Sequence, residues 1–245
     1  MKCYGVIGYP LGHSFSKKYF TEKFKQEGIT DCSYQRFPLK TIDELKGLLV
    51  QYPGLLGLNI TIPHKRSVLP YLTDASNIPA GLNACNCIKI VGEKIIGYNT
   101  DIIGFKNSLL PLLKTNHIHA LILGNGGAAE AVKFVLEKLN ISYTIVSRQI
   151  HDGVHLTYAD LDENIIKENS LIINTTPVGT FPNINDSPAI PYQYLGVEHL
   201  LFDLVYNPEK TSFLQKGEKR GASIQNGYEM LVLQAEESWK LWNAG

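Results

Sequence analysis

The sequence predicts an α/β fold, and three features of its 245 residues support this prediction. Short apolar segments alternate with segments of helical periodicity, as in domains built on largely parallel sheets. A glycine-rich turn at 124–129 lies between an apolar run, 120–123, and a helical segment, 130–139, an order typical of a dinucleotide-binding domain of Rossmann type. The length is sufficient for two modest domains or one large one.

In the first part of the chain, several expected elements have a recognisable end. Gly28 ends the first helix, and Thr41 with Glu44 can form a capping box at the start of the second. Gly92 and Glu93 form the turn of a hairpin. The expected strands are 2–8, 32–37, 55–61, 84–91 and 94–98, and the expected helices are 17–27 and 41–49.

The second part is expected to contain one mononucleotide-binding half and a little more. A helix at 101–114 should lead into it, and the amphipathic segment 228–239 should pack back on the N-terminal part as a helix. The proline-rich stretch 181–191 is expected to be a surface loop. The expected strands are 120–123, 142–146, 171–174 and 200–203.

Composition argues against several classes of protein. Lys plus Arg and Asp plus Glu number 23 each, so no overall basic charge favours nucleic acid or an anionic membrane. No apolar run approaches the ~20 residues of a membrane span. The first residues are broken too early by glycine and proline to form a signal peptide. We therefore expect a cytoplasmic protein that binds neither nucleic acid nor membrane.

The four cysteines do not indicate a metal site. Cys3, Cys32, Cys85 and Cys87 contain no C-x-x-C pair, and a second pair of zinc ligands is missing. We interpret them as small buried side chains in a reducing compartment, and we expect no bound metal.

The glycine turn gives the first functional hypothesis. Gly124 permits a tight turn, Gly126 lets the backbone approach a pyrophosphate without a Cβ in the way, and Ala129 allows close packing of helix on strand. The start of the helix offers free N–H groups and a partial positive charge to phosphates. The alternative is a plain βα turn, because glycine-rich turns also simply connect strands to helices.

Polar side chains gather after the expected strands of the first part. Ser14 and Ser16 follow the first strand and suit a polyhydroxylated ligand, or one of them caps the next helix. Asn59, Thr61 and Lys65 lie at or past the end of the third strand, where open α/β sheets bind ligands.

Asp101 follows the end of another expected strand. It could cap the helix that begins there. The sharper interpretation is a pair of Lys65 and Asp101 that handles a proton. His13 is interpreted as a local hydrogen-bonding group rather than a catalytic one.

The cofactor preference depends on the end of the strand 142–146. An NAD site usually carries an acidic residue roughly 20 residues past the glycines, which bonds the ribose 2′-hydroxyl. Here the strand is followed by Ser147 and Arg148, and no acid occurs until Asp152. Because a guanidinium can fork onto a phosphate, NADP is favoured over NAD.

Taken in order, these motifs resemble those of the shikimate dehydrogenase family. They run from near residue 5 to near residue 235 and so cover nearly the whole chain. The motifs are GYPLGHSFS (8–16), NITIPHK (59–65), ACNCI (84–88), GYNTD (97–101), NTTPVG (174–179), DLVYNP (203–208) with Thr211, and GYEMLVLQ (227–234). The resemblance implies two domains: an α/β substrate-binding domain of residues 1–101, completed by 226–245, and an NADP-binding domain of Rossmann type at 102–225.

The resemblance also implies an activity and roles for individual residues. The activity would be the reversible NADPH-dependent reduction of 3-dehydroshikimate to shikimate, on the route to chorismate and the aromatic amino acids. Lys65 and Asp101 would be the catalytic pair. The substrate would be bound by Ser14, Ser16, Asn59, Thr61, Asn86, Tyr206 and Gln234. NADP would be bound by Gly124, Asn125, Gly126, Gly127, Ala128, Ser147, Arg148, Thr175, Thr176, Val178, Leu204 and Gly227.

The chain departs from the family's usual pattern in two places. Lys17 stands where the family usually has proline, and a second arginine is missing after Arg148. Two other functions therefore stay open: a quinate/shikimate dehydrogenase with relaxed specificity, and a regulatory protein that binds NADP without turnover. A monomer or a homodimer acting on a small-molecule substrate is expected.

Overall fold

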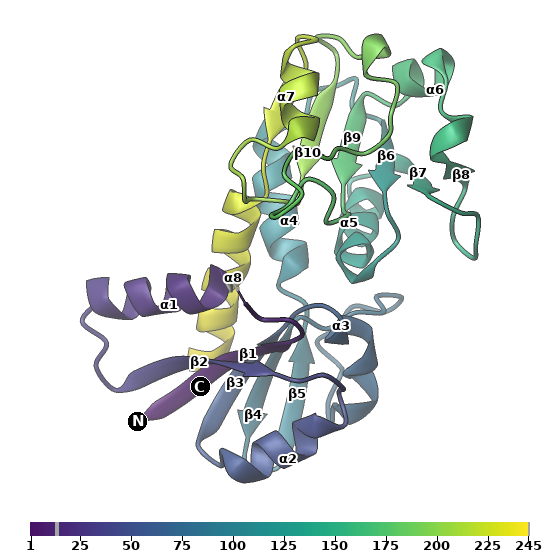
Figure 1. The fold of residues 1–245 in the computed structure, drawn as a ribbon. Coiled ribbons are helices and arrows are strands. Elements are labelled where there is room, and N and C mark those ends of the chain that lie inside the picture. The colour runs from purple at the N-terminus through teal and green to yellow at the C-terminus, as the bar shows by residue number, and fades with distance from the viewer. Residues whose placement is uncertain (13–14, 245) are drawn as a thin grey trace. The chain divides into compact units, whose positions relative to one another are not determined.

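The computed structural model describes residues 1–12 and 15–244. The chain divides into two compact units (Figure 1). Unit 1 consists of Met1–Ile103 and Val232–Gly245, and unit 2 consists of Gly104–Leu231. Each unit has its own sheet.

The sheet of unit 1 is mixed. Its strand order is β2-β1-β3-β4-β5. β1 pairs in parallel with β2 and β3, whereas β4 is antiparallel to both β3 and β5. The expected parallel pairing is present among β1, β2 and β3, and the predicted hairpin adds β4, which runs in the opposite direction and makes the sheet mixed. The strands are β1 (Lys2–Gly8), β2 (Cys32–Pro38), β3 (Leu55–Ile60), β4 (Cys87–Val91) and β5 (Lys94–Tyr98).

Helices cover both faces of this sheet. Figure 1 shows α1 and α8 against one face and α2 against the other. Tyr4 and Val6 of β1 pack with side chains of α1 and α8, while Ile7 packs in the cluster that contains Leu45 and Leu48 of α2. This alternation follows from the two-residue period of a strand. The helices are α1 (Phe15–Gln26), α2 (Glu44–Gln51), α3 (His64–Ser67) and α8 (Tyr228–Asn243), and a 3-10 turn follows α3 at Leu69–Tyr71.

Two helix starts in unit 1 differ from the prediction. α1 begins at Phe15 rather than at residue 17. α2 begins at Glu44 rather than Thr41, because only half of the expected capping box forms: the Glu44 carboxylate accepts the Thr41 N–H at 2.8 Å, and the residue before the helix, Asp43, makes no side-chain cap.

The sheet of unit 2 has six strands, all parallel, in the order β11-β10-β9-β6-β7-β8. The chain starts in the middle and adds strands on both sides, which is the doubly wound arrangement predicted from the sequence. Strands were expected at four of these positions, and the two edge strands were not. The strands are β6 (His119–Leu123), β7 (Ser142–Ser147), β8 (Leu156–Thr157), β9 (Leu171–Asn174), β10 (Leu200–Asp203) and β11 (Ser223–Gln225).

The helices of unit 2 include one that is shorter than expected. The predicted helix 101–114 is α4 (Asp101–Leu109), followed by a 3-10 turn at Leu110–Leu112. Pro111 in that turn has no N–H for an α-helical hydrogen bond, which explains the early end. The others are α5 (Gly127–Lys138), α6 (Glu163–Glu168) and α7 (Ser212–Glu218), with 3-10 turns at Tyr158–Asp160 and Tyr192–Tyr194.

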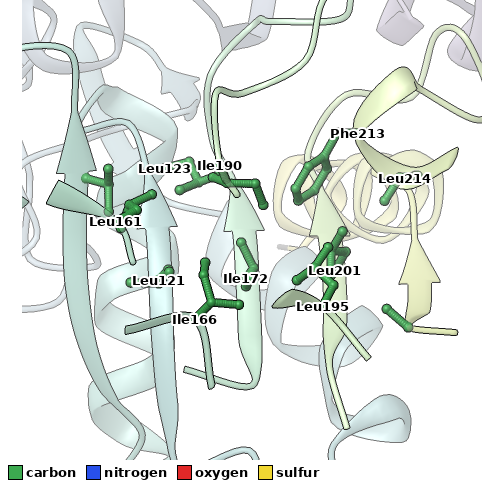
Figure 2. Close-up of a cluster of buried hydrophobic side chains, with 12 residues drawn as sticks. Leu121, Leu123, Leu161, Ile166, Ile172, Ile190, Leu195, Leu201, Phe213 and Leu214 are labelled. Atoms are coloured by element: carbon green, nitrogen blue, oxygen red, sulfur yellow. The ribbon is translucent and has the colours of Figure 1, made fainter. Parts of the chain in front are cut away.

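The core of unit 2 is made by the alternate side chains of its central strands. Figure 2 shows Leu121, Ile172 and Leu201, from three neighbouring strands, in one row. Ile166 of α6 and Phe213 of α7 pack in the same cluster. These layers fix the carboxyl ends of the strands, from which the polar residues of unit 2 emerge.

Candidate active site

An ion pair lies at the strand ends of unit 1. The Nζ of Lys65 is 2.7 Å from Oδ2 of Asp101, and the two side chains are only 15% and 7% exposed. Lys65 comes from α3, directly after β3, and Asp101 is the first residue of α4, after β5. The contact predicted from the two motifs is therefore present.

A buried thiol lies next to this pair. The backbone N–H of Cys85 donates to the carbonyl of Lys65 at 2.8 Å, which fixes the short α3 against the chain segment before β4. Burial raises the pKa of the Cys85 thiol to about 11. The thiol thus stays neutral at physiological pH and does not compete with Asp101 for the ammonium group.

Two of the three predicted hydroxyl ligands, Ser16 and Thr61, are described. Ser14 lies outside the described residues. Ser16 is the second residue of α1, so it is not the cap of that helix, and its hydroxyl lies beside the phenol of Tyr34. Thr61 follows β3 closely against Gly8, where an added Cβ would be 2.5 Å from the Thr61 methyl. The hydroxyl of Thr61 forms no hydrogen bond with the other residues described.

Three amide side chains are buried around the same strand ends. Both groups of the Asn59 amide are used: Oδ1 accepts from Tyr34 at 2.8 Å and Nδ2 donates to Ser238 at 2.9 Å. The Asn86 side chain holds Thr100, accepting its N–H at 2.6 Å and donating to its hydroxyl at 3.0 Å. The Oε1 of Gln234, on α8, is 3.5 Å from Nδ2 of Asn86.

The phenol of Tyr34 is the last member of this hydrogen-bonded group, next to Asn59. Burial raises its pKa well above the usual range, and the nearby Ser16 hydroxyl opposes that rise. The phenol is therefore protonated and donates to Asn59. Of the predicted unit 1 residues that are described, the structure brings Ser16, Asn59, Thr61, Lys65, Asn86, Asp101 and Gln234 to this one edge of the sheet.

In unit 2 the glycine turn links β6 to α5. Gly124 has a φ of +101°, which a residue with a side chain rarely adopts, and a Cβ there would meet Thr176 at 2.7 Å. Gly126 precedes α5 without a side-chain cap, and nothing lies within 4 Å of the place of its absent Cβ.

This turn fits a dinucleotide pyrophosphate. The first N–H groups of α5, including those of Gly127 and Ala128, lack a side-chain cap. The space at Gly126 is open for a close approach to the backbone. The buried Oδ1 of Asn125 has no hydrogen-bond partner among the described residues, while its Nδ2 donates to Asp152 across the loop that follows β7. An open glycine turn before an uncapped helix start is what anionic phosphates require.

The other predicted cofactor residues line the same strand ends. Thr175 donates its hydroxyl to Leu123 at 2.8 Å and so ties the end of β9 to the glycine turn. Thr176 accepts the N–H of Val178 at 3.3 Å. Gly227 lies against Leu204, whose carbonyl oxygen would be 2.2 Å from an added Cβ.

Ser147 ends β7, and Arg148 follows it on the surface. In the part of the chain that the structure describes, the Arg148 guanidinium forms no ion pair or hydrogen bond, so it is available to an anion. Tyr206 is half-buried after β10, and burial raises its pKa. Its hydroxyl therefore remains protonated at physiological pH.

Sequence reasoning missed Tyr34, Thr100 and Ser238, which connect the predicted residues to one another. Ser238 had one available signal, because it is four residues after Gln234 on the same helix face. Among the described residues, His, Cys, Asp and Glu form no cluster able to hold a metal ion. Within those residues, no helix is both long and apolar enough to cross a bilayer.

The two units together define a class: two-domain α/β proteins in which a mixed-sheet domain is joined to a Rossmann-type domain. The comparisons agree with this class and narrow it. The family model of the shikimate dehydrogenase substrate binding domain matches residues 6–88. The shikimate dehydrogenase (NADP(+)) of Caldicellulosiruptor saccharolyticus is 35% identical, over 99% of this chain and 92% of its own length. That of a Methanococcus maripaludis strain is 37% identical, over 98% of this chain and 91% of its own length.

A solved structure leads to the same family. The shikimate 5-dehydrogenase of Thermus thermophilus, in complex with NADP(H) and shikimate, has a TM-score of 0.86 at 28% identity. The alignment covers 99% of this chain and 94% of that one. The chain belongs to the shikimate dehydrogenase family.

Proposed function

We propose that this chain catalyses the reversible reduction of 3-dehydroshikimate to shikimate with NADPH, as a step toward chorismate and the aromatic amino acids. Membership of the family supports the reaction, because the relatives that match almost the whole length of this chain are NADP-dependent shikimate dehydrogenases. The observation in this chain that carries the proposal is the Lys65–Asp101 pair, 2.7 Å apart at the strand ends of unit 1.

The chemistry divides between cofactor and protein. NADPH supplies the hydride when it is bound. Lys65 donates a proton from Nζ to the oxygen of the ketone as it becomes an alcohol, and its positive charge stabilises the negative charge that develops on this oxygen. Asp101 orients the ammonium group. In the oxidative direction Lys65 accepts the proton, and one proton is released per turnover, so higher pH favours oxidation of shikimate.

The substrate-binding assignments extend this proposal. Ser14, Ser16 and Thr61 provide hydroxyls for the carboxylate and ring of the substrate, and Asn86 and Gln234 provide amides for its hydroxyls. The position of the four described residues, Ser16, Thr61, Asn86 and Gln234, at the same strand ends supports these roles. Asn59 was assigned to the same site, but its two amide groups are already engaged by Tyr34 and Ser238. Tyr206 is assigned to the substrate from unit 2.

The cofactor assignments concern the residues of the glycine turn and its neighbours. Gly124–Ala128 hold the pyrophosphate with backbone N–H groups. Ser147 and Arg148 bind the 2′-phosphate, which only NADP carries. Thr175, Thr176, Val178, Leu204 and Gly227 line the remainder of the cofactor site. We accordingly assign residues 1–101 with 226–245 to substrate binding and 102–225 to NADP binding, and the two compact units support this division.

The setting of the enzyme completes the proposal. The four cysteines are free thiols, which supports a reducing, cytoplasmic compartment. The quaternary state is a monomer or a homodimer, and sedimentation velocity distinguishes the two.

A spectrophotometric assay of NADPH formation tests the reaction. Purified protein is incubated with shikimate or quinate and with NADP or NAD, and the Lys65→Ala variant, prepared identically, controls for a contaminating host enzyme. Activity that is highest with shikimate and NADP and lost in the variant supports the proposal. Equal turnover of quinate would indicate the relaxed enzyme, and NADP binding without turnover would indicate the regulatory protein.

A further inference from the structure

Helix α8 presents three residues of the same face to the sheet of unit 1. Gln234, Ser238 and Trp242 follow one another at intervals of four residues, which places them on one side of a helix. Trp242 donates its indole N–H to the carbonyl of Ile88 at 2.9 Å and packs against Gly57, where no side chain would fit. Trp242 therefore fixes the C-terminal part of α8 in the core of unit 1.

On the helix, Ser238 lies between Trp242 and the predicted substrate ligand Gln234. It is fully buried beside the Cys87 thiol, and its hydroxyl lies within hydrogen-bond distance of three nitrogen or oxygen groups. It accepts from Nδ2 of Asn59 at 2.9 Å, contacts the Thr100 hydroxyl at 3.2 Å, and reaches the Gln234 carbonyl at 2.9 Å. One donor and two lone pairs satisfy all three contacts.

The partners of Ser238 come from separate elements. Asn59 belongs to β3 and also accepts from Tyr34 of β2. Thr100 precedes α4 and is bonded to Asn86, which precedes β4. A buried chain of hydrogen bonds thus runs along these strand ends. Helix α8 joins it through Ser238 and, with longer contacts of 3.5 Å, through Oε1 of Gln234.

We propose that Ser238 is a positioning residue. Its hydrogen bonds to Asn59 and Thr100 fix the position of α8 relative to the strand ends of unit 1, and this position in turn determines where the Gln234 amide lies. The contacts of the Gln234 side chain with Asn86 and Thr100 are 3.5 Å long, at the outer limit of a hydrogen bond. One turn further along α8, Ser238 makes shorter contacts with Asn59 and Thr100, at 2.9 and 3.2 Å. The inference rests on the proposed function, because it concerns the shikimate site.

The Ser238→Ala variant tests the inference, with Ser108→Ala as a matched control. Ser108 is also a buried helical serine, but within the described residues its hydroxyl bonds to carbonyls of its own helix alone, those of Gly104 and Phe105. For Ser238→Ala we expect the KM for shikimate to rise roughly 5- to 20-fold, while kcat and the KM for NADP change less than about two-fold. For Ser108→Ala all three constants should stay near those of the wild type.

A double-mutant cycle separates positioning from a general structural effect. If Ser238 acts through Gln234, then adding Ser238→Ala to Gln234→Ala raises the KM for shikimate by less than about two-fold further. Losses that multiply, or a Ser238→Ala variant that behaves like Ser108→Ala, overturn the inference.

A second variant keeps the test decisive if Ser238→Ala does not fold. Thr100→Val conserves shape and removes the hydroxyl that contacts Ser238, so the same rise in KM and the same lack of additivity with Gln234→Ala are expected; an unchanged KM refutes the inference. Failure of the wild type to oxidise shikimate would instead reject the proposed function. An active wild type with an unaffected Ser238→Ala variant would reject only the role of Ser238.

Discussion

Lys65 is largely buried and is paired with the Asp101 carboxylate, and these two features predict the effect of removing its side chain. Lys65→Ala should lower kcat by roughly 10²–10⁴-fold, the usual range for a lost general acid. The fold and the affinity for NADP should change little, because Lys65 lies in the short α3 and is not part of the core cluster of unit 1. Lys18→Ala is the control, since Lys18 is 79% exposed on α1. A Lys65→Ala enzyme that keeps more than half of its turnover would remove Lys65 from the mechanism.

The proposed role of Arg148 is to bind the 2′-phosphate of NADP, and this role predicts the effect of removing its side chain. Arg148→Ala should weaken NADP roughly ten-fold or more, because a charge-assisted hydrogen bond to the 2′-phosphate is lost, and should leave NAD nearly unchanged. Arg220→Ala, which removes another exposed arginine of unit 2, serves as the control. Affinities of both cofactors, measured by fluorescence titration at low and high salt, show whether the loss is specific. Equal losses for NADP and NAD would make Arg148 structural.

The predictable residues of the site share one property. Lys65 and Asp101 lie where an expected strand ends, and this position alone marks them as candidates. Ser238 could not be found this way, because it lies inside a helix and its partner Asn59 is 179 residues away in sequence. The sequence pattern of a helix gives its faces but not which distant side chain a face will meet.

At the scale of elements, a substitution in the glycine turn should affect NADP binding without affecting stability. Gly126→Ala should leave the free energy of unfolding within about 0.5 kcal/mol of the wild type, since a Cβ there meets open space and the backbone is extended. It should nevertheless weaken NADP about ten-fold or more, because the Cβ occupies the space proposed for the pyrophosphate. Chemical denaturation and NADP titration together check both parts.

Gly47→Ala is the control for Gly126→Ala. Gly47 lies in α2, also with open space at its Cβ, and belongs to unit 1. This change should stabilise the helix slightly and leave NADP binding unchanged. Unaltered NADP affinity in Gly126→Ala would show that the turn is only a connection between β6 and α5.

Strands were easier to predict than helix ends, for a physical reason. A buried strand such as 171–174 is an apolar run of three residues that ends in Asn174, and its observed limits match the prediction. A helix start depends on which side chain caps it. The same residues, Thr41 and Glu44, can form either a helix cap or a turn before the helix, and the sequence pattern does not distinguish the two. The edge strands β8 and β11 were missed because they have only two and three residues and are partly exposed.

At the scale of the whole molecule, the order of the motifs predicted the family. Which polar residues contact one another depends on how the strands of each sheet are arranged. The doubly wound sheet of unit 2 follows from alternating strands and helices, which allow few arrangements. In unit 1 the local hairpin was predictable, while its pairing with β3 was not, because that pairing joins distant segments.

Global stability should depend on pH through one buried carboxyl in unit 2. Asp203 is fully buried at the end of β10, and burial raises its pKa to about 6 although Thr211, Val205 and Asn174 donate hydrogen bonds to it. The folded state therefore holds this proton more tightly than the unfolded state. The contribution of Asp203 to stability is complete below about pH 4 and is lost as the pH rises through about 6.

Asp203→Asn should remove this dependence, because an amide has nearly the same shape, stays neutral, and its oxygen can still accept from Asn174 and Val205. The free energy of unfolding of the variant, relative to the wild type, should increase by about 1–3 kcal/mol between pH 4.5 and pH 7.5. Urea denaturation of both proteins at the two pH values measures this difference, and Asp186→Asn, at an exposed carboxyl of unit 2, controls for the loss of one negative charge. If the difference between Asp203→Asn and the wild type is the same at both pH values, Asp203 is already ionised at pH 4.5, and its three hydrogen bonds outweigh its burial.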